Sequence, residues 1–298
     1  MRRWLILLIV WLVPSAAALR AADHDFDPAG VKLHYIDEGQ GEAVLLVHGF
    51  AINSRLQWYF SNIAQTLAKK YHVISLDCRG HGLSGKPHDP KLYGQQMAED
   101  VIRLLDHLKI RKAHVVGYSM GGYIVLNLLA THPDRLLSVT TGGAGVPRTV
   151  DVDFLNKLAD ALEQGKGMGL LLRRLSAPGQ PEPSAEDIKR ANRLLSMFND
   201  PKALAAAIRS LKNLAPPEKA LEENKVPVLA IVGALDPLKS QVDEMKGRLA
   251  DLKTVVIRGA DHMDAFEKPQ FLSALTDFLA AHSTSDVNCC EPASGSGR

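Results

Sequence analysis

Three polar side chains of this chain have the types, and the order along the sequence, that nucleophilic catalysis requires. Ser119 stands between two glycines in the run Gly117 to Gly121, and Asp236 and His262 follow much later. A serine hydroxyl attacks a carbonyl efficiently only when a base takes its proton and an acid orients that base. The three residues are therefore candidates for a Ser-His-Asp triad that transfers acyl groups.

The residues around Ser119 predict a sharp turn from a strand into a helix. The stretch from Ala113 to Gly117 has strand character, and the stretch from Gly122 to Ala130 is apolar enough for a buried helix. Side chains at positions 117 and 121 would collide in such a turn, so glycine is expected at both. Short Gly-x-Ser-x-Gly runs also occur in ordinary turns, but the flanking strand and helix favour a strained, exposed serine.

Asp236 and His262 each follow a predicted strand. Val226 to Gly233 precedes the aspartate, and Thr254 to Ile257 precedes the histidine. Each of the three residues thus lies just past the carboxyl end of a strand, in the order serine, aspartate, histidine. This order is typical of one α/β architecture of hydrolases.

Both residues also have a structural alternative. Asp236 precedes Pro237 and could simply start a turn. Most of the 11 histidines must be surface or packing residues, and His262 is distinguished only by its place after the last strand. The adjacent Asp261 is a poorer candidate for the acid, because neighbouring side chains rarely point at each other.

From about His34 to about His282 the chain resembles the α/β-hydrolase superfamily, in particular its serine-dependent, esterase-like and lipase-like members with a helical cap. Two more matches carry this resemblance: His48-Gly49-Phe50 after the strand from Ala43, and the run Asp77 to Ser84 after the strand from His72. The resemblance implies that Ser119 is the nucleophile, that His262 is the general base and then acid, and that Asp236 holds the imidazole.

The resemblance also implies an oxyanion hole made by the backbone N–H groups of Phe50 and Met120. Losing one such donor costs roughly 3 kcal/mol of transition-state stabilisation. His81 and Ser84 are expected only to hold their loop in shape. The residues expected to support the turn and the oxyanion loop are His48, Gly49, Gly117 and Gly121.

Strand and helix signals alternate along most of the chain, which predicts an α/β fold with a mostly parallel sheet of the eight-stranded type, flanked by helices. The predicted strands are Val31 to Asp37, Ala43 to Val47, His72 to Leu76, Ala113 to Tyr118, Leu136 to Thr141, Val228 to Gly233 and Thr254 to Ile257. The predicted helices are Ser61 to Lys70, Gly94 to Leu108, Met120 to Thr131, Gln241 to Ala250 and Pro269 to Ala281.

The segment 148–217 breaks this alternation, because it has helical periodicity and no strand signal. It is expected to be a helical cap inserted between the two parts of the core, 23–147 and 218–282. Any single leucine of the cap is expected to pack within the protein before it contacts a substrate. The apolar residues that could roof a cavity are Leu155, Leu158, Leu162, Met168, Leu170, Leu171, Leu172 and Leu175.

The N-terminus has the pattern of a signal peptide over residues 1–22. A basic start precedes an apolar run from Trp4 to Val13, and small residues follow, with cleavage expected after Ala18 or Ala22. An uncleaved membrane anchor is the alternative, although the run is shorter than the roughly 20 residues of a spanning helix. We therefore expect a secreted or periplasmic protein with no stable membrane span after cleavage.

Composition limits the remaining possibilities. The chain has 298 residues with a net charge of +2, which does not indicate a nucleic-acid partner. No metal-spaced Cys/His cluster is present in the sequence, and neither a metal nor a cofactor is expected. The tail 283–298 is expected to be disordered. It holds Cys289 and Cys290, two of three cysteines, so a disulfide framework is not indicated.

These features together predict an exported serine hydrolase that cleaves carboxylic esters of small to medium apolar acyl groups. Haloalkane dehalogenases and epoxide hydrolases use aspartate where this chain has Ser119, which disfavours both activities. Carbon–carbon bond hydrolases and cofactor-free perhydrolases share the triad and remain alternatives. A non-catalytic, ligand-binding member of the superfamily is a further alternative.

Overall fold

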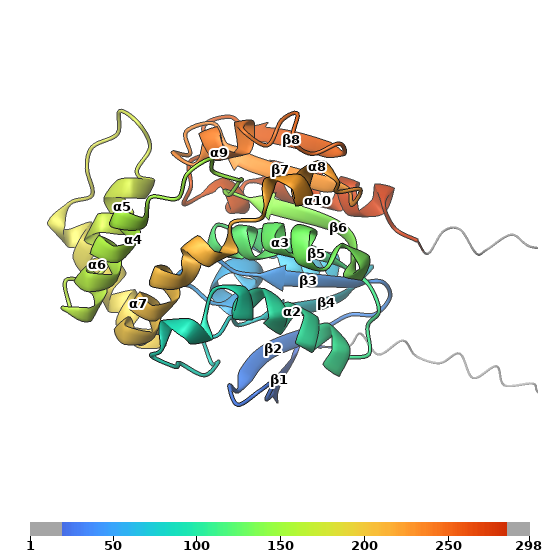
Figure 1. Ribbon diagram of the computed structural model, residues 1–298, viewed down its shortest axis with the longest axis horizontal. Helices are drawn as coiled ribbons and strands as arrows, with labels where there is room; N and C mark the ends of the chain where they lie inside the picture. The colour runs from blue at the N-terminus through green and yellow to red at the C-terminus, as the bar shows by residue number, and fades with distance from the viewer. Residues whose placement is uncertain (1–19, 285–298) are drawn as a thin grey trace, which may run out of the picture.

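One eight-stranded sheet organises residues 20–284, the part of the chain that the computed structural model describes (Figure 1). Its strand order is β1-β2-β4-β3-β5-β6-β7-β8. β2 runs antiparallel to both β1 and β4, and all the other neighbours are parallel. The strands are β1 (Ala22–Phe26), β2 (Leu33–Glu38), β3 (Ala43–Val47), β4 (His72–Leu76), β5 (Ala113–Tyr118), β6 (Leu136–Gly142), β7 (Val228–Gly233) and β8 (Leu252–Ile257). The predicted mostly parallel α/β sheet is confirmed.

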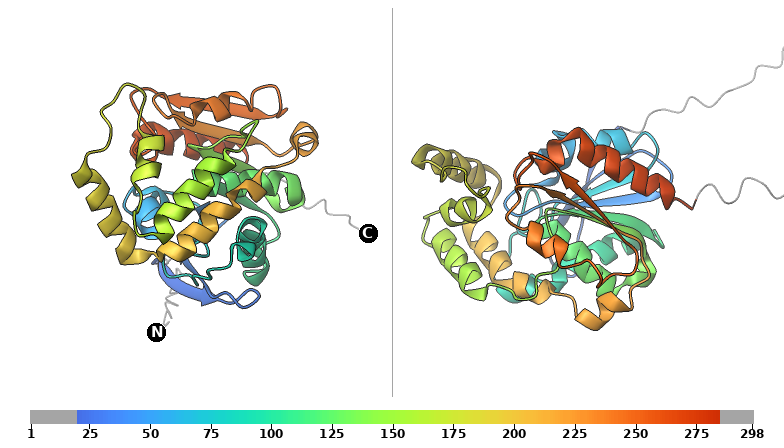
Figure 2. Two further views of the ribbon diagram at one scale, coloured as in Figure 1. Left: turned by 60° about the vertical axis from the view of Figure 1, so that its left-hand side comes forward. Right: turned by 90° about the horizontal axis from the view of Figure 1, so that it is seen from above.

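Helices cover both faces of this sheet (Figure 2). β3 is apolar at every position because its side chains point alternately to the two faces, and both faces are buried. One face is covered by α2 (Gln95–His107), α3 (Met120–Thr131), α8 (Glu218–Glu222) and α9 (Lys239–Asp243). The other is covered by the π-helical turn η1 (Arg55–Tyr59), α1 (Ile63–Leu67) and α10 (Pro269–Ala281).

Three elements differ from the sequence-based expectation. β1 carries no strand signal, because it is a polar edge strand in which only Phe26 is buried. The helix expected from Gln241 to Ala250 is wrong: α9 ends at Asp243, and Gly247 adopts a left-handed φ of 78° that a helix cannot accommodate. The helix expected from Ser61 begins only after Asn62, which has a φ of 59°.

Between β6 and α8, a stretch that the structure describes in full, the chain forms four α-helices and no strand. We call these helices the cap: α4 (Val152–Glu163), α5 (Gly169–Leu175), α6 (Ala185–Phe198) and α7 (Pro201–Ser210). They form a separate layer beside the carboxyl ends of the strands (Figures 1 and 2). The cap has its own apolar cluster, which includes Leu158, Leu162, Leu195, Leu204 and Ile208.

The expected signal segment and tail fall largely outside the described residues, as do Cys289 and Cys290. β1 begins at Ala22, the last residue of the segment 1–22. Within residues 20–284, no helix is both long enough and apolar enough to cross a membrane.

The loop after β4 is held in place by the buried carboxylate of Asp77. Its oxygens accept hydrogen bonds from the backbone N–H groups of Ser54 and Leu83, and Oδ2 lies 3.0 Å from Nδ1 of His34. Burial alone would raise the pKa of Asp77, but the hydrogen bonds from His34 and from these amides outweigh it and hold the pKa well below its ordinary value. A single charge thereby ties the β4 loop to strand β2 and to the segment before η1.

We expect Asp77→Asn to lower the free energy of unfolding by about 2 to 4 kcal/mol at pH 7, because charge-assisted hydrogen bonds are lost at a buried site. A carboxylate whose pKa is lower in the folded than in the unfolded state stabilises the fold above its unfolded pKa of about 4. The difference from wild type should therefore shrink as the pH falls below about 4. Denaturant unfolding from pH 7 to pH 3 measures this difference. The control Asp251→Asn, at an exposed position, should unfold like wild type at pH 7.

Candidate active site

Ser119 sits at the turn between β5 and α3 in a strained conformation, with φ 52° and ψ −113°. Two close backbone contacts make this turn possible. A Cβ on Gly117 would lie 2.1 Å from the carbonyl oxygen of Gly121, and a Cβ on Gly121 would lie 2.1 Å from the carbonyl oxygen of Val47. No side chain fits at either position, so the two glycines let the strand and helix approach closely enough to present the serine.

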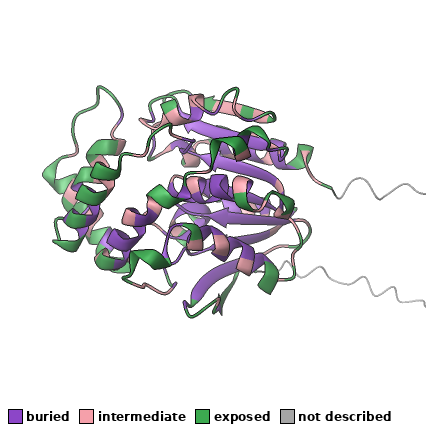
Figure 3. Ribbon diagram, in the orientation of Figure 1, coloured by how far each residue is buried: buried purple, intermediate pink, exposed green. Residues whose placement is uncertain are grey.

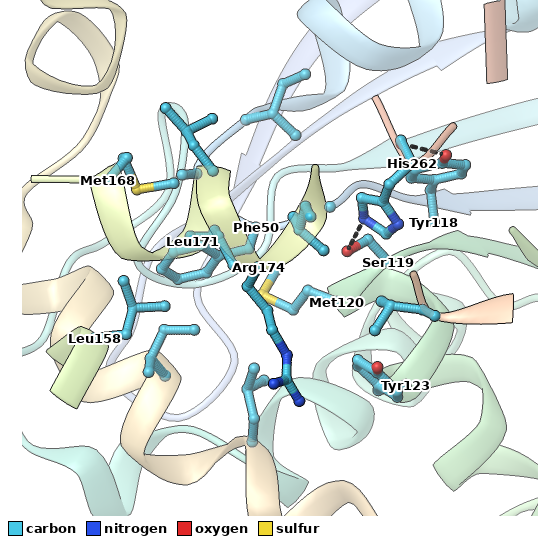
Figure 4. A pocket seen from close by; sticks show the side chains of 18 of the residues that line it. Phe50, Tyr118, Ser119, Met120, Tyr123, Leu158, Met168, Leu171, Arg174 and His262 are labelled. Atoms are coloured by element: carbon cyan, nitrogen blue, oxygen red, sulfur yellow. Dashed lines mark hydrogen bonds between the residues drawn. The ribbon is translucent and has the colours of Figure 1, made fainter. Parts of the chain in front are cut away.

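The structure brings the three candidate triad residues together. Figure 4 shows Ser119 and His262 side by side. Nε2 of His262 lies 3.0 Å from Oγ of Ser119, and Nδ1 of His262 lies 2.9 Å from Oδ2 of Asp236. A carboxylate only accepts hydrogen bonds, so Nδ1 carries the proton and Nε2 is free to accept the serine proton. Both Asp236 and His262 are buried. This geometry is what a general base needs to activate the hydroxyl.

The loops that carry the aspartate and the histidine are fixed by local hydrogen bonds. The second oxygen of Asp236 accepts a hydrogen bond from the N–H of Leu238 at 2.8 Å. Asp236 therefore stabilises a turn with one oxygen and contacts the imidazole with the other. Asp261 does not pair with His262; its Oδ1 accepts the N–H groups of Met263 and Asp264.

His48 orients the peptide bond between Gly49 and Phe50. Its Nε2 accepts the backbone N–H of Cys78 at 3.0 Å, so the proton is on Nδ1, which donates to the carbonyl of Gly49 at 2.7 Å. Complete burial lowers the pKa of His48, which keeps the ring neutral for this dual role. In a planar trans peptide the C=O and N–H point in opposite directions. Anchoring the Gly49 carbonyl therefore sets the direction of the Phe50 N–H.

Gln57, on the π-helical turn η1, fixes the peptide bond between His48 and Gly49. The N–H of Gly49 donates to its Oε1 at 2.7 Å, and the side chain is buried. Among the residues that the structure describes, neither Phe50 nor Met120 donates its backbone N–H to a hydrogen-bond partner. Two amides that flank the serine region are therefore available as oxyanion donors. No sequence signal pointed to Gln57, because a lone glutamine outside a motif carries none.

The triad opens into an apolar cavity of about 410 Å³ between the sheet and the cap (Figure 4). Ser119 and His262 lie at its core side, together with Phe50, and the cap supplies the opposite wall. Six of the eight cap residues proposed to form a roof do so: Leu155, Leu158, Met168, Leu171, Leu172 and Leu175. Leu162 packs inside the cap instead, and Leu170 is exposed.

Comparison with known proteins identifies the family. The family model described as the alpha/beta hydrolase fold matches residues 42–269. The chain belongs to the α/β-hydrolase family. Within the described residues, no group of three or more His, Cys, Asp or Glu side chains is arranged to hold a metal ion.

Curated relatives and a solved structure are consistent with this assignment. The chain is 29% identical to 3-oxoadipate enol-lactonase 2 of Acinetobacter baylyi, over 80% of this chain and 90% of the relative. It is 26% identical to the pimeloyl-[acyl-carrier protein] methyl ester esterase of Aeromonas hydrophila, over 81% and 96%. A carboxylesterase structure from Nitrososphaera gargenis shares the fold, with a TM-score of 0.72 and 24% identity over 89% of this chain and all of that one. These relatives support a hydrolase.

In this hydrolase, the residue just before the serine also holds the histidine. The Tyr118 hydroxyl donates to the backbone carbonyl of His262 at 2.6 Å, and both residues are buried. The Tyr118 ring centroid lies 5.6 Å from that of His262 and 5.1 Å from that of Phe266. Tyr118 thus connects β5 to the histidine loop. The sequence placed this tyrosine in the turn, but its partner is 144 residues away.

We expect Tyr118→Phe to lower kcat for a soluble ester by roughly tenfold with little change in KM, because small displacements of a catalytic group are costly. It should also reduce stability by about 1 to 3 kcal/mol, since the His262 carbonyl loses its donor. Steady-state kinetics and denaturant unfolding measure the two effects.

Tyr93→Phe is the matched control, since the buried Tyr93 donates to the carbonyl of Pro87 and does not line the cavity. It should lose stability but retain kcat. An equal loss of kcat in both variants would refute a positioning role for Tyr118.

Proposed function

We propose that this protein is a serine hydrolase that cleaves carboxylic esters of small to medium apolar acyl groups through an acyl-serine intermediate. The observation that carries the proposal is the hydrogen-bonded series from Asp236 through His262 to Ser119 at the wall of an apolar cavity. The names of two relatives, an enol-lactonase and a methyl ester esterase, refer to carboxylic ester bonds.

Acylation begins when His262 takes the Ser119 proton through Nε2 and the serine oxygen attacks the ester carbonyl. The developing oxyanion accepts hydrogen bonds from the Phe50 and Met120 amides, which need no reorganisation because His48 and the start of α3 already fix them. The imidazolium then protonates the alkoxide leaving group, and the acyl group remains on the serine. Asp236 stabilises the imidazolium while it exists.

Deacylation repeats these steps with water as the nucleophile. His262 takes a proton from water, the hydroxide attacks the acyl-serine, and the same two amides stabilise the second oxyanion. Protonation of the serine oxygen by His262 releases the carboxylic acid and restores the resting enzyme.

The size and lining of the cavity determine which acyl groups the protein prefers. Its wall is mainly aliphatic and aromatic, and each methylene buried there contributes about 0.8 kcal/mol. A volume of about 410 Å³ lies toward the small end of the range for small-molecule pockets. Acyl chains of intermediate length should therefore gain the most binding free energy, and longer chains should not fit in the cavity.

A panel of chromogenic esters of increasing acyl length tests the mechanism and the pocket together. We expect kcat/KM to rise with acyl length and then fall once the chain exceeds the cavity. Ser119→Ala should lower kcat by roughly four to six orders of magnitude, the loss typical of a triad nucleophile.

Ser196→Ala, on the exposed face of α6, is the matched control and should retain wild-type turnover. Wild-type turnover in Ser119→Ala would contradict the mechanism. Labelling of Ser119 by a fluorophosphonate probe without ester turnover would instead favour carbon–carbon hydrolysis or perhydrolysis, and no labelling at all would favour a binding protein.

We also propose that the protein is exported, on the basis of the N-terminal sequence pattern. Ala22 pairs with Asp37 in the β1–β2 ladder, so cleavage after Ala18 would leave β1 complete, whereas cleavage after Ala22 would shorten it. We expect the exported protein to begin at Leu19. N-terminal sequencing of protein from the periplasm or the medium tests this, and an intact residue 1 on membrane-bound protein would indicate an anchor instead.

A further inference from the structure

Large apolar side chains are exposed on the outer side of the cap. Of the exposed large hydrophobic residues in the described part of the chain, five belong to the cap, and three of these lie in the last turns of α6. The three are Leu194, Met197 and Phe198, with exposed fractions of 53%, 63% and 37%. Figure 3 shows α6 as a largely exposed helix at the outer end of the molecule. Exposed apolar residues gathered in this way mark an interaction surface.

α6 carries two opposite stripes at helical spacing. The inner stripe is Ile188, Ala191, Asn192 and Leu195, which are buried or half-buried toward the cap interior. The outer stripe, at the same spacing on the other side, is Arg190, Arg193, Leu194 and Met197, all exposed. Packing within the cap explains only the inner stripe. In the outer one, Leu194 reaches the cavity wall, and Met197 is 63% exposed.

The outer side of α6 is also cationic. From Ile188 onward the helix contains Lys189, Arg190 and Arg193 and no acidic residue, and none of these three cations forms a salt bridge with a described residue. The acids of the helix, Glu186 and Asp187, are confined to its first turn, where Asp187 completes the capping box. Apolar side chains interspersed with lysine and arginine are typical of helices that bind anionic lipid surfaces.

This surface is continuous with the cavity. Leu194 and Phe198 belong both to the exposed patch and to the cavity wall. Met263, on the loop after β8, is 55% exposed and also lines the cavity. Exposed apolar groups on α6 and on the histidine loop therefore form part of the cavity wall.

We propose that the cap docks through the outer side of α6 onto an anionic lipid surface, with the mouth of the cavity facing that surface. Docking would place the apolar passage next to the phase in which apolar esters partition. Delivery of such esters rests on the proposed function, whereas docking itself does not.

Co-sedimentation with vesicles tests the proposal on the full-length protein carrying Ser119→Ala, so that no ester is consumed. We expect strong binding to vesicles of equal parts phosphatidylcholine and phosphatidylglycerol, and weak binding to phosphatidylcholine alone. The triple variant Lys189→Gln/Arg190→Gln/Arg193→Gln should weaken partition roughly a hundredfold, about fivefold for each cation. Met197→Ser should weaken it roughly tenfold.

Two matched controls separate α6 from general surface properties. Phe60→Ser removes the most exposed large apolar side chain, and Lys219→Gln/Lys225→Gln/Lys253→Gln removes three exposed cations elsewhere. Both should bind vesicles like the parent. Every variant has the same N-terminus, so differences among them report on the cap.

In the active background, Met197→Ser and the triple α6 variant should keep wild-type turnover of a short soluble ester, because none of the four residues lines the cavity. No vesicle binding, equal losses in the controls, or unchanged binding in the α6 variants would each overturn docking. A dimer that Met197→Ser dissociates, with no vesicle binding, would assign the surface to a second copy. Vesicle binding without any ester turnover would retain docking and refute the proposed function.

Discussion

The close approach of three backbone segments around Ser119 is the constraint on which the rest of this structure depends. Gly121 lies against the end of β3, and Gly117 lies against the first turn of α3, at distances that exclude any side chain. This contact forces the serine into a left-handed conformation and aims its hydroxyl out of the sheet. It also places the free Met120 amide at the positive end of α3.

Several buried polar groups transmit this arrangement to neighbouring loops. His48 connects the end of β3 to the loop after β4, Asp77 ties that loop to β2 and to the segment before η1, and Tyr118 connects β5 to the histidine loop. Each is hydrogen-bonded at a buried site, where an unpaired partner is costly, so the loops cannot shift independently. The geometry around the serine is thus preorganised by buried groups outside the candidate triad.

The cap closes the cavity above this rigid base. Its inner leucines wall the cavity, and its helix α6 presents a second apolar and cationic surface to the outside. This helix therefore faces two environments, the cavity on one side and the outside of the molecule on the other. Cavity and outer surface meet at Leu194 and Phe198.

The sequence by itself determined the sheet, the candidate triad and the serine turn. Buried parallel strands are continuous apolar runs, and the turn between β5 and α3 depends on residues that are neighbours along the chain. The polar edge strand β1 and the early end of α9 escaped prediction, because neither an edge position nor a single left-handed glycine alters apolar periodicity enough.

Only the tertiary structure decided which polar groups meet. It placed Nε2 of His262 beside Ser119, gave Tyr118 the His262 carbonyl as partner, and brought Gln57 to Gly49. It also showed which cap leucines face the cavity and that Leu194, Met197 and Phe198 of α6 are exposed. These outcomes depend on contacts between segments far apart in the chain. Local sequence sets the preference of each segment for helix or strand, but packing sets which side chains face each other.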